Sequence, residues 1–212
     1  YNLGYSNNTE IISLFMVNFK FKLYKKIFNL LQGSGVGRIK LLAKISKNVR
    51  TNLKPEYVEI CGFRIYLDPT DHFGLSVKPY HIPKIYEKII KSGDVVVDVG
   101  SNIGIHTLYL SKLVGKMGKV YSFEPEPNNF ALLKKNVEFN KCNNVIVEQK
   151  AISNRTGKIK LSLSDSMAGH RISNSDSQEN TIIIDSVSLD DYFKNHDRKI
   201  DFIKIDTEGF DG

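Results

Sequence analysis

The feature that most limits the fold of this chain is an unbroken β-branched run at residues 95–99, with the sequence Val-Val-Val-Asp-Val. A strand with one face in water alternates apolar and polar residues, and this run lacks that alternation. A strand covered on both faces is typical of a parallel sheet between layers of helices. Gly100 follows at once, and residues 107–114 have the spacing of a helix. We therefore expect a strand, a tight loop and a helix of an α/β fold.

The alternation of strand and helix continues along the chain with short connections. Expected strands span residues 57–60, 63–67, 95–99, 119–123, 145–149, 158–163, 181–187 and 201–206, and expected helices span residues 82–90, 107–114, 128–140 and 189–193. The first two strands flank Cys61-Gly62 as a hairpin, and the strands at 158–163 and 181–187 form an antiparallel pair around a polar loop. This order predicts a parallel sheet that binds its ligand beyond the carboxyl ends of its strands.

Length and cysteine content narrow the class of protein. The 212 residues suit one sizeable domain with an appendage. Cys61 and Cys142 are the only cysteines, so we expect neither a disulfide framework nor a cysteine-type zinc site, which favours a reducing, cytoplasmic compartment. The longest charge-free hydrophobic stretch of the amino-terminal part, residues 11–19, is about half of the roughly 20 residues that a membrane-spanning helix needs.

The net charge of +7 is concentrated in an amino-terminal arm. Residues 11–55 hold ten Lys and Arg and no acid, giving +10, whereas the rest holds 20 basic and 23 acidic residues, giving −3, and the two sum to +7. We therefore divide the chain into a basic helical arm at residues 1–55 and a main domain at residues 56–212. Because the main domain is mildly acidic, the charge does not argue for nucleic acid as its partner.

The arm is predicted to form a basic amphipathic helix, because its apolar residues recur at helical spacing between lysines. Three hypotheses stay open for its role. The helix packs on the main domain, or residues 11–50 make peripheral contact with an anionic membrane, or the arm binds nucleic acid. The third is disfavoured because the aromatic residues lie on the apolar face and not among the lysines. The oligomeric state is left open.

The loop at residues 98–104, Asp-Val-Gly-Ser-Asn-Ile-Gly, joins the expected strand to the expected helix. Its glycines allow a ligand to approach backbone amides at a helix amino terminus, where an anion is favoured. A P-loop would place Lys and Ser or Thr after the last glycine, yet Ile105 follows Gly104. A dinucleotide fingerprint would need a glycine where Asn102 stands, and Asp98 would repel the phosphates.

S-adenosylmethionine suits this loop better than a phosphate ligand. Its carboxylate would meet the helix terminus, its ammonium and sulfonium groups would tolerate Asp98, and Glu124 would accept hydrogen bonds from both ribose hydroxyls. In the alternative interpretation, Asp98 caps a helix and Glu124 is a surface acid. The acids and glycines at 98–104, 124 and 206–209 all follow expected strands, which predicts a single crevice at one edge of the sheet.

Three segments are similar to successive blocks of the FkbM family of S-adenosylmethionine-dependent methyltransferases. They are residues 94–104 (Asp-Val-Val-Val-Asp-Val-Gly-Ser-Asn-Ile-Gly), 123–128 (Phe-Glu-Pro-Glu-Pro-Asn) and 203–209 (Ile-Lys-Ile-Asp-Thr-Glu-Gly). The resemblance covers about residues 60–212 and implies a class I, Rossmann-like methyltransferase fold, whose sheet has seven strands. The fourth expected strand of that sheet ends at residue 206, so we expect the sheet to be truncated there, with its carboxyl-terminal part missing.

The same resemblance implies a set of cofactor-binding residues. They are Gly100 and Gly104 at the cofactor, Glu124 on the ribose, and the residues around Ala151 and Ile152 beside the adenine. Asp98, Ser101 and Asn102 of the same loop complete the set of candidate cofactor-binding residues.

An oxygen atom is the expected methyl acceptor. Enzymes that methylate exocyclic amines of bases carry an Asp/Asn-Pro-Pro-aromatic segment after the fourth strand, and this chain has Asp-Thr-Glu-Gly at residues 206–209. Methylation of carbon 5 of a pyrimidine needs a cysteine near that place, and both cysteines lie elsewhere. We therefore expect a small-molecule or glycan hydroxyl as substrate, carried by a sugar, a glycolipid or a secondary metabolite.

A hydroxyl acceptor needs a base, and Asp206, Glu208 and His170 are the candidate catalytic residues. Two carboxylates two residues apart would raise the pKa of one of them or jointly hold a divalent ion. The alternative is that Asp206 caps a helix, Glu208 is solvated and His170 is an exposed loop residue. Two other functions stay open, namely an NAD-linked oxidoreductase and a non-catalytic cofactor-binding module docked to a membrane.

Overall fold

The computed structural model describes Leu23, Lys26 and residues 56–67, 82–163, 171–172 and 181–207. Of the expected helix of the arm only Leu23 and Lys26 are described, both in a helix, and His170 and Glu208 lie outside the described residues. The chain divides into two compact units, and the second comprises residues 59–66 and 81–212. The division of the chain at residue 55 stays a prediction. The elements described below belong to the second unit, apart from the first two residues of β1.

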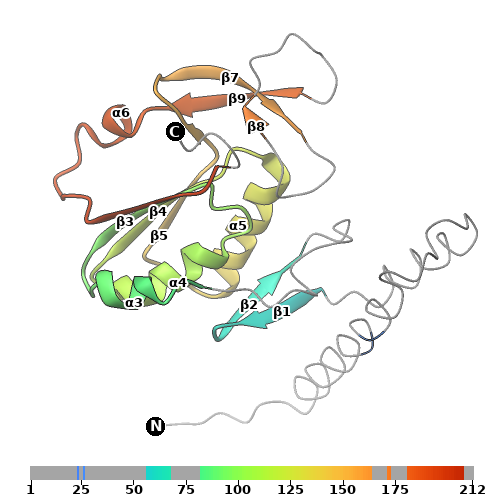
Figure 1. Cartoon of the computed structure of the whole chain (residues 1–212), viewed down its shortest axis with the longest axis vertical. Helices are drawn as coiled ribbons and strands as arrows, with labels where there is room; N and C mark the ends of the chain where they lie inside the picture. Colours follow the sequence, from blue (N-terminus) through green and yellow to red (C-terminus); the bar gives the residue numbers. More distant parts are fainter. Residues whose placement is uncertain are drawn as a thin grey trace, which may run out of the picture. The chain divides into compact units, whose positions relative to one another are not determined.

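The centre of the fold is a four-stranded parallel sheet in the order β10-β3-β4-β5 (Figure 1). Its strands are β3 (Val95–Val99), β4 (Lys119–Phe123), β5 (Val145–Glu148) and β10 (Phe202–Ile205). All five residues of β3 are buried, as the unbroken β-branched run predicts. The α/β fold with a parallel sheet is therefore confirmed. β3 is an inner strand, and the loop that follows it lies between the ends of its neighbours β10 and β4.

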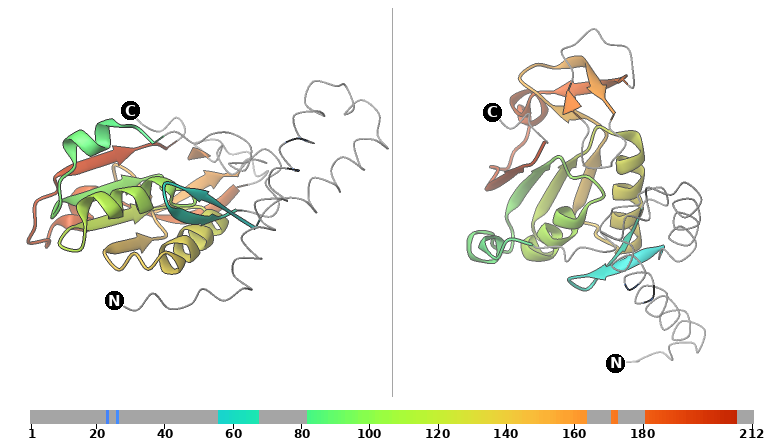
Figure 2. Two further views of the ribbon diagram at one scale, coloured as in Figure 1. Left: turned by 90° about the horizontal axis from the view of Figure 1, so that it is seen from below. Right: turned by 45° about the vertical axis from the view of Figure 1, so that its right-hand side comes forward.

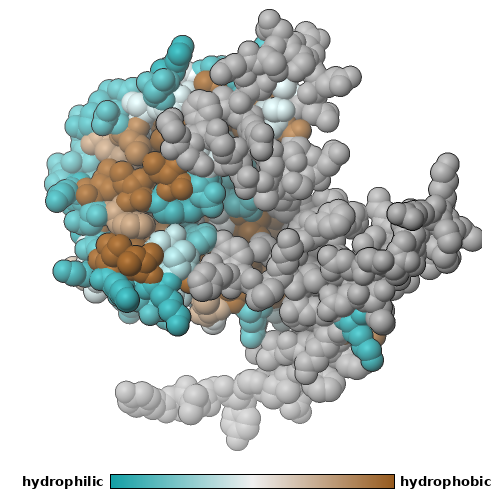
Figure 3. Space-filling model, viewed as in Figure 1, coloured by the Kyte–Doolittle hydropathy of each residue, from teal (hydrophilic) through white to brown (hydrophobic). Residues whose placement is uncertain are grey.

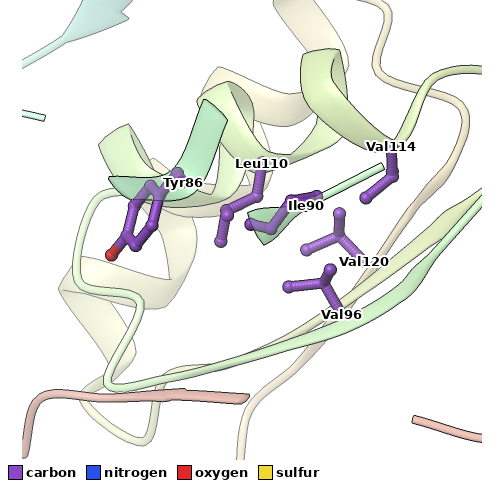
Figure 4. Packing of buried hydrophobic residues seen from close by; sticks show 6 residues of the cluster. All are labelled: Tyr86, Ile90, Val96, Leu110, Val114 and Val120. Atoms are coloured by element: carbon purple, nitrogen blue, oxygen red, sulfur yellow. The ribbon is translucent and has the colours of Figure 1, made fainter. Parts of the chain in front are cut away.

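Two hydrophobic clusters cover the two faces of β3, because successive side chains of a strand point to opposite faces. Val96 packs with residues of α3 (Ile85–Ile89), α4 (Ile105–Val114) and their flanks, and Figure 4 shows this cluster. On the other face, Val95, Val97 and Val99 pack in a cluster that includes residues of α6 (Leu189–Phe193). The two layers explain why this strand shows no polar alternation.

A second sheet has the order β6-β9-β7-β8 and lies beyond the carboxyl end of β5 (Figures 1 and 2). Its strands are β6 (Ala151–Ile152), β7 (Gly157–Ser162), β8 (Arg171–Ile172) and β9 (Thr181–Val187). The antiparallel pairing of β7 with β9 confirms the sequence-based expectation. The two-residue strands β6 and β8 were not expected, because a periodic pattern needs a longer segment.

The expected hairpin is confirmed as β1 (Tyr57–Ile60) and β2 (Phe63–Tyr66). Its turn uses two residues with positive φ, Cys61 at 54° and Gly62 at 85°, as a type I′ turn requires. Two backbone amides of β2 donate hydrogen bonds to asparagine side chains. One asparagine lies in α5 (Pro127–Phe139), and the other is the residue that follows this helix. Asn136 Oδ1 accepts from Tyr66 N at 2.7 Å, and Asn140 Oδ1 accepts from Arg64 N at 3.1 Å.

β10 pairs on one side with β3 and with no other strand of the described segments. Ile203 and Ile205 on this strand are 41% and 52% exposed. Figure 3 shows hydrophobic surface at the position of β10, on the left of that view. No helix among the described residues has both the length and the apolar composition to cross a bilayer.

Candidate cofactor and active site

The ends of β3, β4 and β10 meet around the glycine loop. Gly100 N and Ser101 N both donate to Phe123 O, at 3.0 and 3.1 Å, and Asp206 N donates to Val99 O at 3.1 Å. Gly100 has φ 71°, and a Cβ at this position would lie 2.0 Å from the backbone oxygen of Asp206. Only glycine therefore allows the loop and the end of β10 to approach this closely.

The amides of the loop are already used inside the protein. Asn102 N donates to Glu124 Oε2 at 2.8 Å, Ile103 N donates to Asn102 Oδ1 at 2.7 Å, and Gly104 N donates to Ser101 O at 2.9 Å. These loop amides are therefore not available to bind an anion in this conformation, although the sequence predicted that they would be. The N-cap of α4 is Gly104, with φ 91° and no side-chain hydrogen bond, so the first turn of α4 is the place left for a carboxylate.

Glu124 is a buried carboxylate with room for a further hydrogen bond. It is 5% exposed, and besides Asn102 N it accepts from Glu126 N, to Oε1 at 3.0 Å. A carboxylate has about four acceptor sites. The Asn129 side chain is a third donor to Glu124, so one site remains for a ribose hydroxyl and not the two that were expected. Burial raises the pKa of Glu124 to about 7, against hydrogen bonds from the amides of Glu126 and Asn102 that lower it. A buried carboxylate that can accept a further hydrogen bond, next to a closely packed glycine loop, suits the ribose of S-adenosylmethionine.

Asp98 lies beneath the loop with its side chain fully buried. Its Oδ1 is 2.9 Å from Lys204 Nζ, and its Oδ2 accepts from Thr107 Oγ1 at 2.6 Å. Thr107 in turn accepts from Ser122 Oγ at 3.0 Å. The negative charge of Asp98 is therefore balanced within the protein, and its direct contact with a cofactor stays a prediction. Ser101 is also turned inward, with Oγ donating to Asp98 O at 2.8 Å.

Lys204 is the residue of this site that sequence reasoning missed. It stands opposite Asp98 in the register of β10 and β3, and its side chain is 9% exposed. Its Nζ donates to Gly100 O at 3.0 Å and lies 3.9 Å from Asp206 Oδ2. The available signal was a lysine inside the otherwise apolar run Phe-Ile-Lys-Ile at residues 202–205. A buried lysine requires a partner, and Asp98 is the acid that the parallel pairing brings to it.

Asp206 follows β10 with its side chain 62% exposed, beside the glycine loop. Glu208 and His170 lie outside the described residues, so their place in the site stays a prediction. Tyr86 of α3 is a second residue that the sequence did not indicate. Burial raises its pKa to about 12, with smaller contributions from the charges of Asp98 and Asp206.

His106 contacts the Tyr86 ring edge to face, with 5.7 Å between ring centroids. Its pKa is lowered by burial and then by the charge of Lys204.

Ala151 and Ile152 form β6, which follows the end of β5. Ala151 is 4% exposed and packs with Leu161 and Ile184 in a cluster of the second sheet. Contact of these two residues with adenine therefore stays a prediction. No group of three or more His, Cys, Asp or Glu side chains in the described part of the chain is arranged to hold a metal ion.

The comparison with protein families identifies this arrangement. Residues 98–212 match the family model of the Methyltransferase FkbM domain. The chain belongs to the FkbM methyltransferase family. The match spans more than half of the chain and includes the glycine loop, Glu124 and Asp206. It confirms the predicted family, the class I methyltransferase fold and S-adenosylmethionine as the cofactor, whereas the domain bounds at residues 56–212 stay a prediction.

Individual relatives of this FkbM domain cover smaller shares of the chain. A ribosomal protein L11 methyltransferase of Anoxybacillus flavithermus is 36% identical over 84 residues, which are 39% of this chain and 26% of that protein. Methyltransferase 1 of Beauveria bassiana is 22% identical over 69% of this chain and 68% of its own length. A crystal structure of a SAM-dependent methyltransferase from Aquifex aeolicus is 32% identical over 34% of this chain and 38% of that chain, with a TM-score of 0.32. The chain thus spans about a quarter of the first relative and about two thirds of the second.

Proposed function

We propose that this FkbM-family protein transfers a methyl group from S-adenosylmethionine to a hydroxyl oxygen of a sugar, a glycolipid or a secondary metabolite. One observation carries the choice of acceptor chemistry, namely the exposed carboxylate of Asp206 at the edge of the sheet where the glycine loop and Glu124 also lie. A carboxylate there can accept the hydroxyl hydrogen and orient the oxygen.

The cofactor supplies a methyl group bound to a positively charged sulfur. When the methyl group is transferred, the neutral thioether S-adenosylhomocysteine is the leaving group. The chain's own residues position and bind it. Glu124 accepts a hydrogen bond from the ribose, and Gly100 and Gly104 let the loop pack closely against Asp206 and Leu133. The first turn of α4 meets the carboxylate of the cofactor. Lys204 fixes the Gly100 carbonyl, so that the loop keeps one conformation before the cofactor arrives.

Acceptor chemistry other than oxygen receives no support from the chain. The segment after β10 carries an acid and no Asp/Asn-Pro-Pro-aromatic pattern, which is the mark of methylation on amines of bases. The only two cysteines are Cys61 and Cys142. Both line a cavity at the amino-terminal ends of the central strands, away from the glycine loop. Glu208 and His170 remain further candidates for the base, on the evidence of the sequence alone.

The first experiment separates methyl transfer from the two rival functions. Calorimetric titration should show binding of S-adenosylhomocysteine and no binding of NAD. A panel of hydroxylated sugars, glycolipids and metabolites is then tested for release of S-adenosylhomocysteine from S-adenosylmethionine. Binding without turnover of any acceptor would favour the non-catalytic module, and binding of NAD alone would favour the oxidoreductase.

The second experiment tests Asp206. The variant Asp206→Asn should bind S-adenosylhomocysteine as the wild type does and lose turnover by roughly 100-fold or more, the usual contribution of a general base. Asp197→Asn is the matched control, because Asp197 is exposed and precedes β10 at its other end. Equal turnover in Asp206→Asn and the wild type would remove Asp206 from the mechanism.

A further inference from the structure

A cavity of about 780 Å³ lies at the amino-terminal ends of the central strands, whereas the glycine loop lies at their carboxyl-terminal ends. Its walls are the Cys61-Gly62 turn, the end of α4, the start of β4 and the loop at residues 141–144. Lys119 is the first residue of β4 and Asn144 directly precedes β5, whereas Glu124 follows the end of β4. Because the strands are parallel, the cavity and the cofactor site are separated by the length of a strand, on the order of 15 Å.

The lining of this cavity carries charge of one sign. Four lysines line it, Lys112, Lys116, Lys119 and Lys141, and no Asp or Glu does. None of the four forms an ion pair with an acid of the segments that the structure describes. Like charges gathered in a concave site repel one another and attract anions, because the low-dielectric walls concentrate the field. Lys112, Lys116 and Lys141 are exposed, so their ammonium groups can meet an anion that enters the cavity from solvent.

The walls of the cavity are held in place by hydrogen bonds. Asn144 Nδ2 donates to Ser111 O and to Gly115 O, both at 2.9 Å, which closes the carboxyl end of α4. Ser111 Oγ donates back to Asn144 Oδ1 at 2.6 Å. The helix end and the loop before β5 are thus joined, and Lys112 and Lys116 project from a fixed helix end. A prearranged site loses less entropy when it binds a ligand.

We propose that this cavity binds a phosphate-bearing ligand with two or more negative charges. Its volume lies within the range of about 300–1,000 Å³ that is typical of small-molecule sites. Ammonium groups bind phosphate oxygens as point charges, and several can share one ligand. Two sources supply this chemistry, a soluble polyphosphate compound and the headgroups of anionic lipids. The site is independent of methyl transfer, because none of its residues belongs to the cofactor site.

The test compares a pocket variant with a charge-matched control. Lys112→Gln/Lys116→Gln removes two lysines of the cavity, and Lys194→Gln/Lys199→Gln removes two exposed lysines that do not line it. Binding of inorganic tripolyphosphate is measured by calorimetry at constant ionic strength. Binding of phosphatidylcholine vesicles that contain phosphatidylinositol 4-phosphate, whose headgroup carries more than two negative charges, is measured by flotation against pure phosphatidylcholine vesicles. Circular dichroism checks the folding of each variant.

We expect the pocket variant to bind at least one of the two probes roughly tenfold or more weakly than the wild type, with the control variant unchanged. Loss with tripolyphosphate identifies a soluble ligand, and loss with vesicles alone identifies a lipid headgroup. The proposal is wrong if the wild type binds neither probe, or if both lysine pairs have the same effect, because binding would then follow total charge alone.

A second measurement needs no substitution. Cys61 and Cys142 line the cavity with free thiols, so a ligand inside it should shield them. The rate at which each thiol reacts with N-ethylmaleimide is followed by mass spectrometry, with the probe that binds or with sodium chloride at the same ionic strength. Slower labelling with the probe supports the site, and equal rates at a saturating concentration would overturn it.

Discussion

The ammonium nitrogen of Lys204 lies 2.9 Å from Oδ1 of Asp98, and the two residues are register partners on neighbouring strands. The Asp98 side chain is fully buried, and that of Lys204 is 9% exposed. Since Lys204 also donates to the Gly100 carbonyl, a single ammonium group joins β10, β3 and the glycine loop. The ion pair is therefore part of the scaffold of the cofactor site.

The variant Lys204→Met should unfold more easily than the wild type, because it leaves the charge of Asp98 buried without a partner. The free energy of unfolding should fall by about 3–5 kcal/mol, the usual cost of breaking a buried pair. Urea denaturation measures this loss. The double variant Lys204→Met/Asp98→Asn should recover part of it, since the uncompensated charge is gone. A loss below about 1 kcal/mol would show that the pair is solvated, as surface ion pairs are.

The same substitution should raise the pKa of His106. Burial lowers this pKa first, and the positive charge of Lys204 lowers it further. Removing that charge leaves burial and the charges of Asp98 and Asp206, which act in the raising direction. An NMR titration of the imidazole in wild type and Lys204→Met measures the change. An unchanged or lower pKa in the variant would contradict the electrostatic contact.

Cofactor binding should weaken as the pH falls below 7. Burial raises the pKa of Glu124 to about 7, and in the neutral acid the proton would occupy the acceptor site that is left for a ribose hydroxyl. At pH 6 roughly one tenth of the free protein carries this charge, so affinity for S-adenosylhomocysteine should be roughly tenfold lower than at pH 8. Calorimetry at the two pH values tests this. Glu124→Gln should bind weakly at both and show a flatter profile.

The raised pKa of Glu124 also affects stability. The folded state binds the proton more tightly than the unfolded state does, so protonation of Glu124 favours folding. This contribution is present below the unfolded value of 4.5 and is lost as the pH rises through about 7. Its size is about 3 kcal/mol, at about 1.4 kcal/mol for each unit of pKa difference. The free energy of unfolding of the wild type should therefore decline more steeply between pH 5 and 7.5 than that of Glu124→Gln.

Substitution of Gly100 by alanine should damage both the fold and cofactor binding. The new Cβ would lie 2.0 Å from the backbone oxygen of Asp206, so the loop or the end of β10 must move. Gly93→Ala is the matched control, because Gly93 also has a positive φ, 98°, with no atom within 4 Å of the added carbon. The control should cost about 1–3 kcal/mol for the backbone strain alone, and Gly100→Ala should cost more. Thermal unfolding and S-adenosylhomocysteine titration compare the two, and equal effects would show that the clash is relieved without cost.

Much of the fold follows from local sequence pattern. The β3 run and the strand at residues 119–123 were expected with the bounds that the structure has. Helix starts were less predictable. α4 begins at Ile105, two residues earlier than expected, because Gly104 caps it without a polar side chain. α5 begins at Pro127, where Glu126 is the N-cap and its side chain accepts from Asn129 N at 2.6 Å.

The site was less predictable than the fold because it depends on register and on side chains that reach across strands. The carboxyl-edge position of Gly100, Glu124 and Asp206 follows from parallel pairing, which the sequence indicates. The partnership of Lys204 with Asp98 requires that β10 lie beside β3 in one register. The use of the Asn102 amide by Glu124 requires the folded loop. The lysine inside the apolar run at residues 202–205 indicates that Lys204 needs a partner, but the sequence does not indicate which acid that partner is.

The outer side of β10 has a consequence for handling the protein at high concentration. Its backbone donors and acceptors face away from β3, and Ile203 and Ile205 add oily side chains beside them. No strand of the described residues pairs with this side of β10, and such a side is a template on which another chain can add a further strand. We therefore expect aggregation of concentrated samples to begin by pairing of strands at β10. The variant Ile205→Lys should reduce it, because a charged side chain disfavours such pairing.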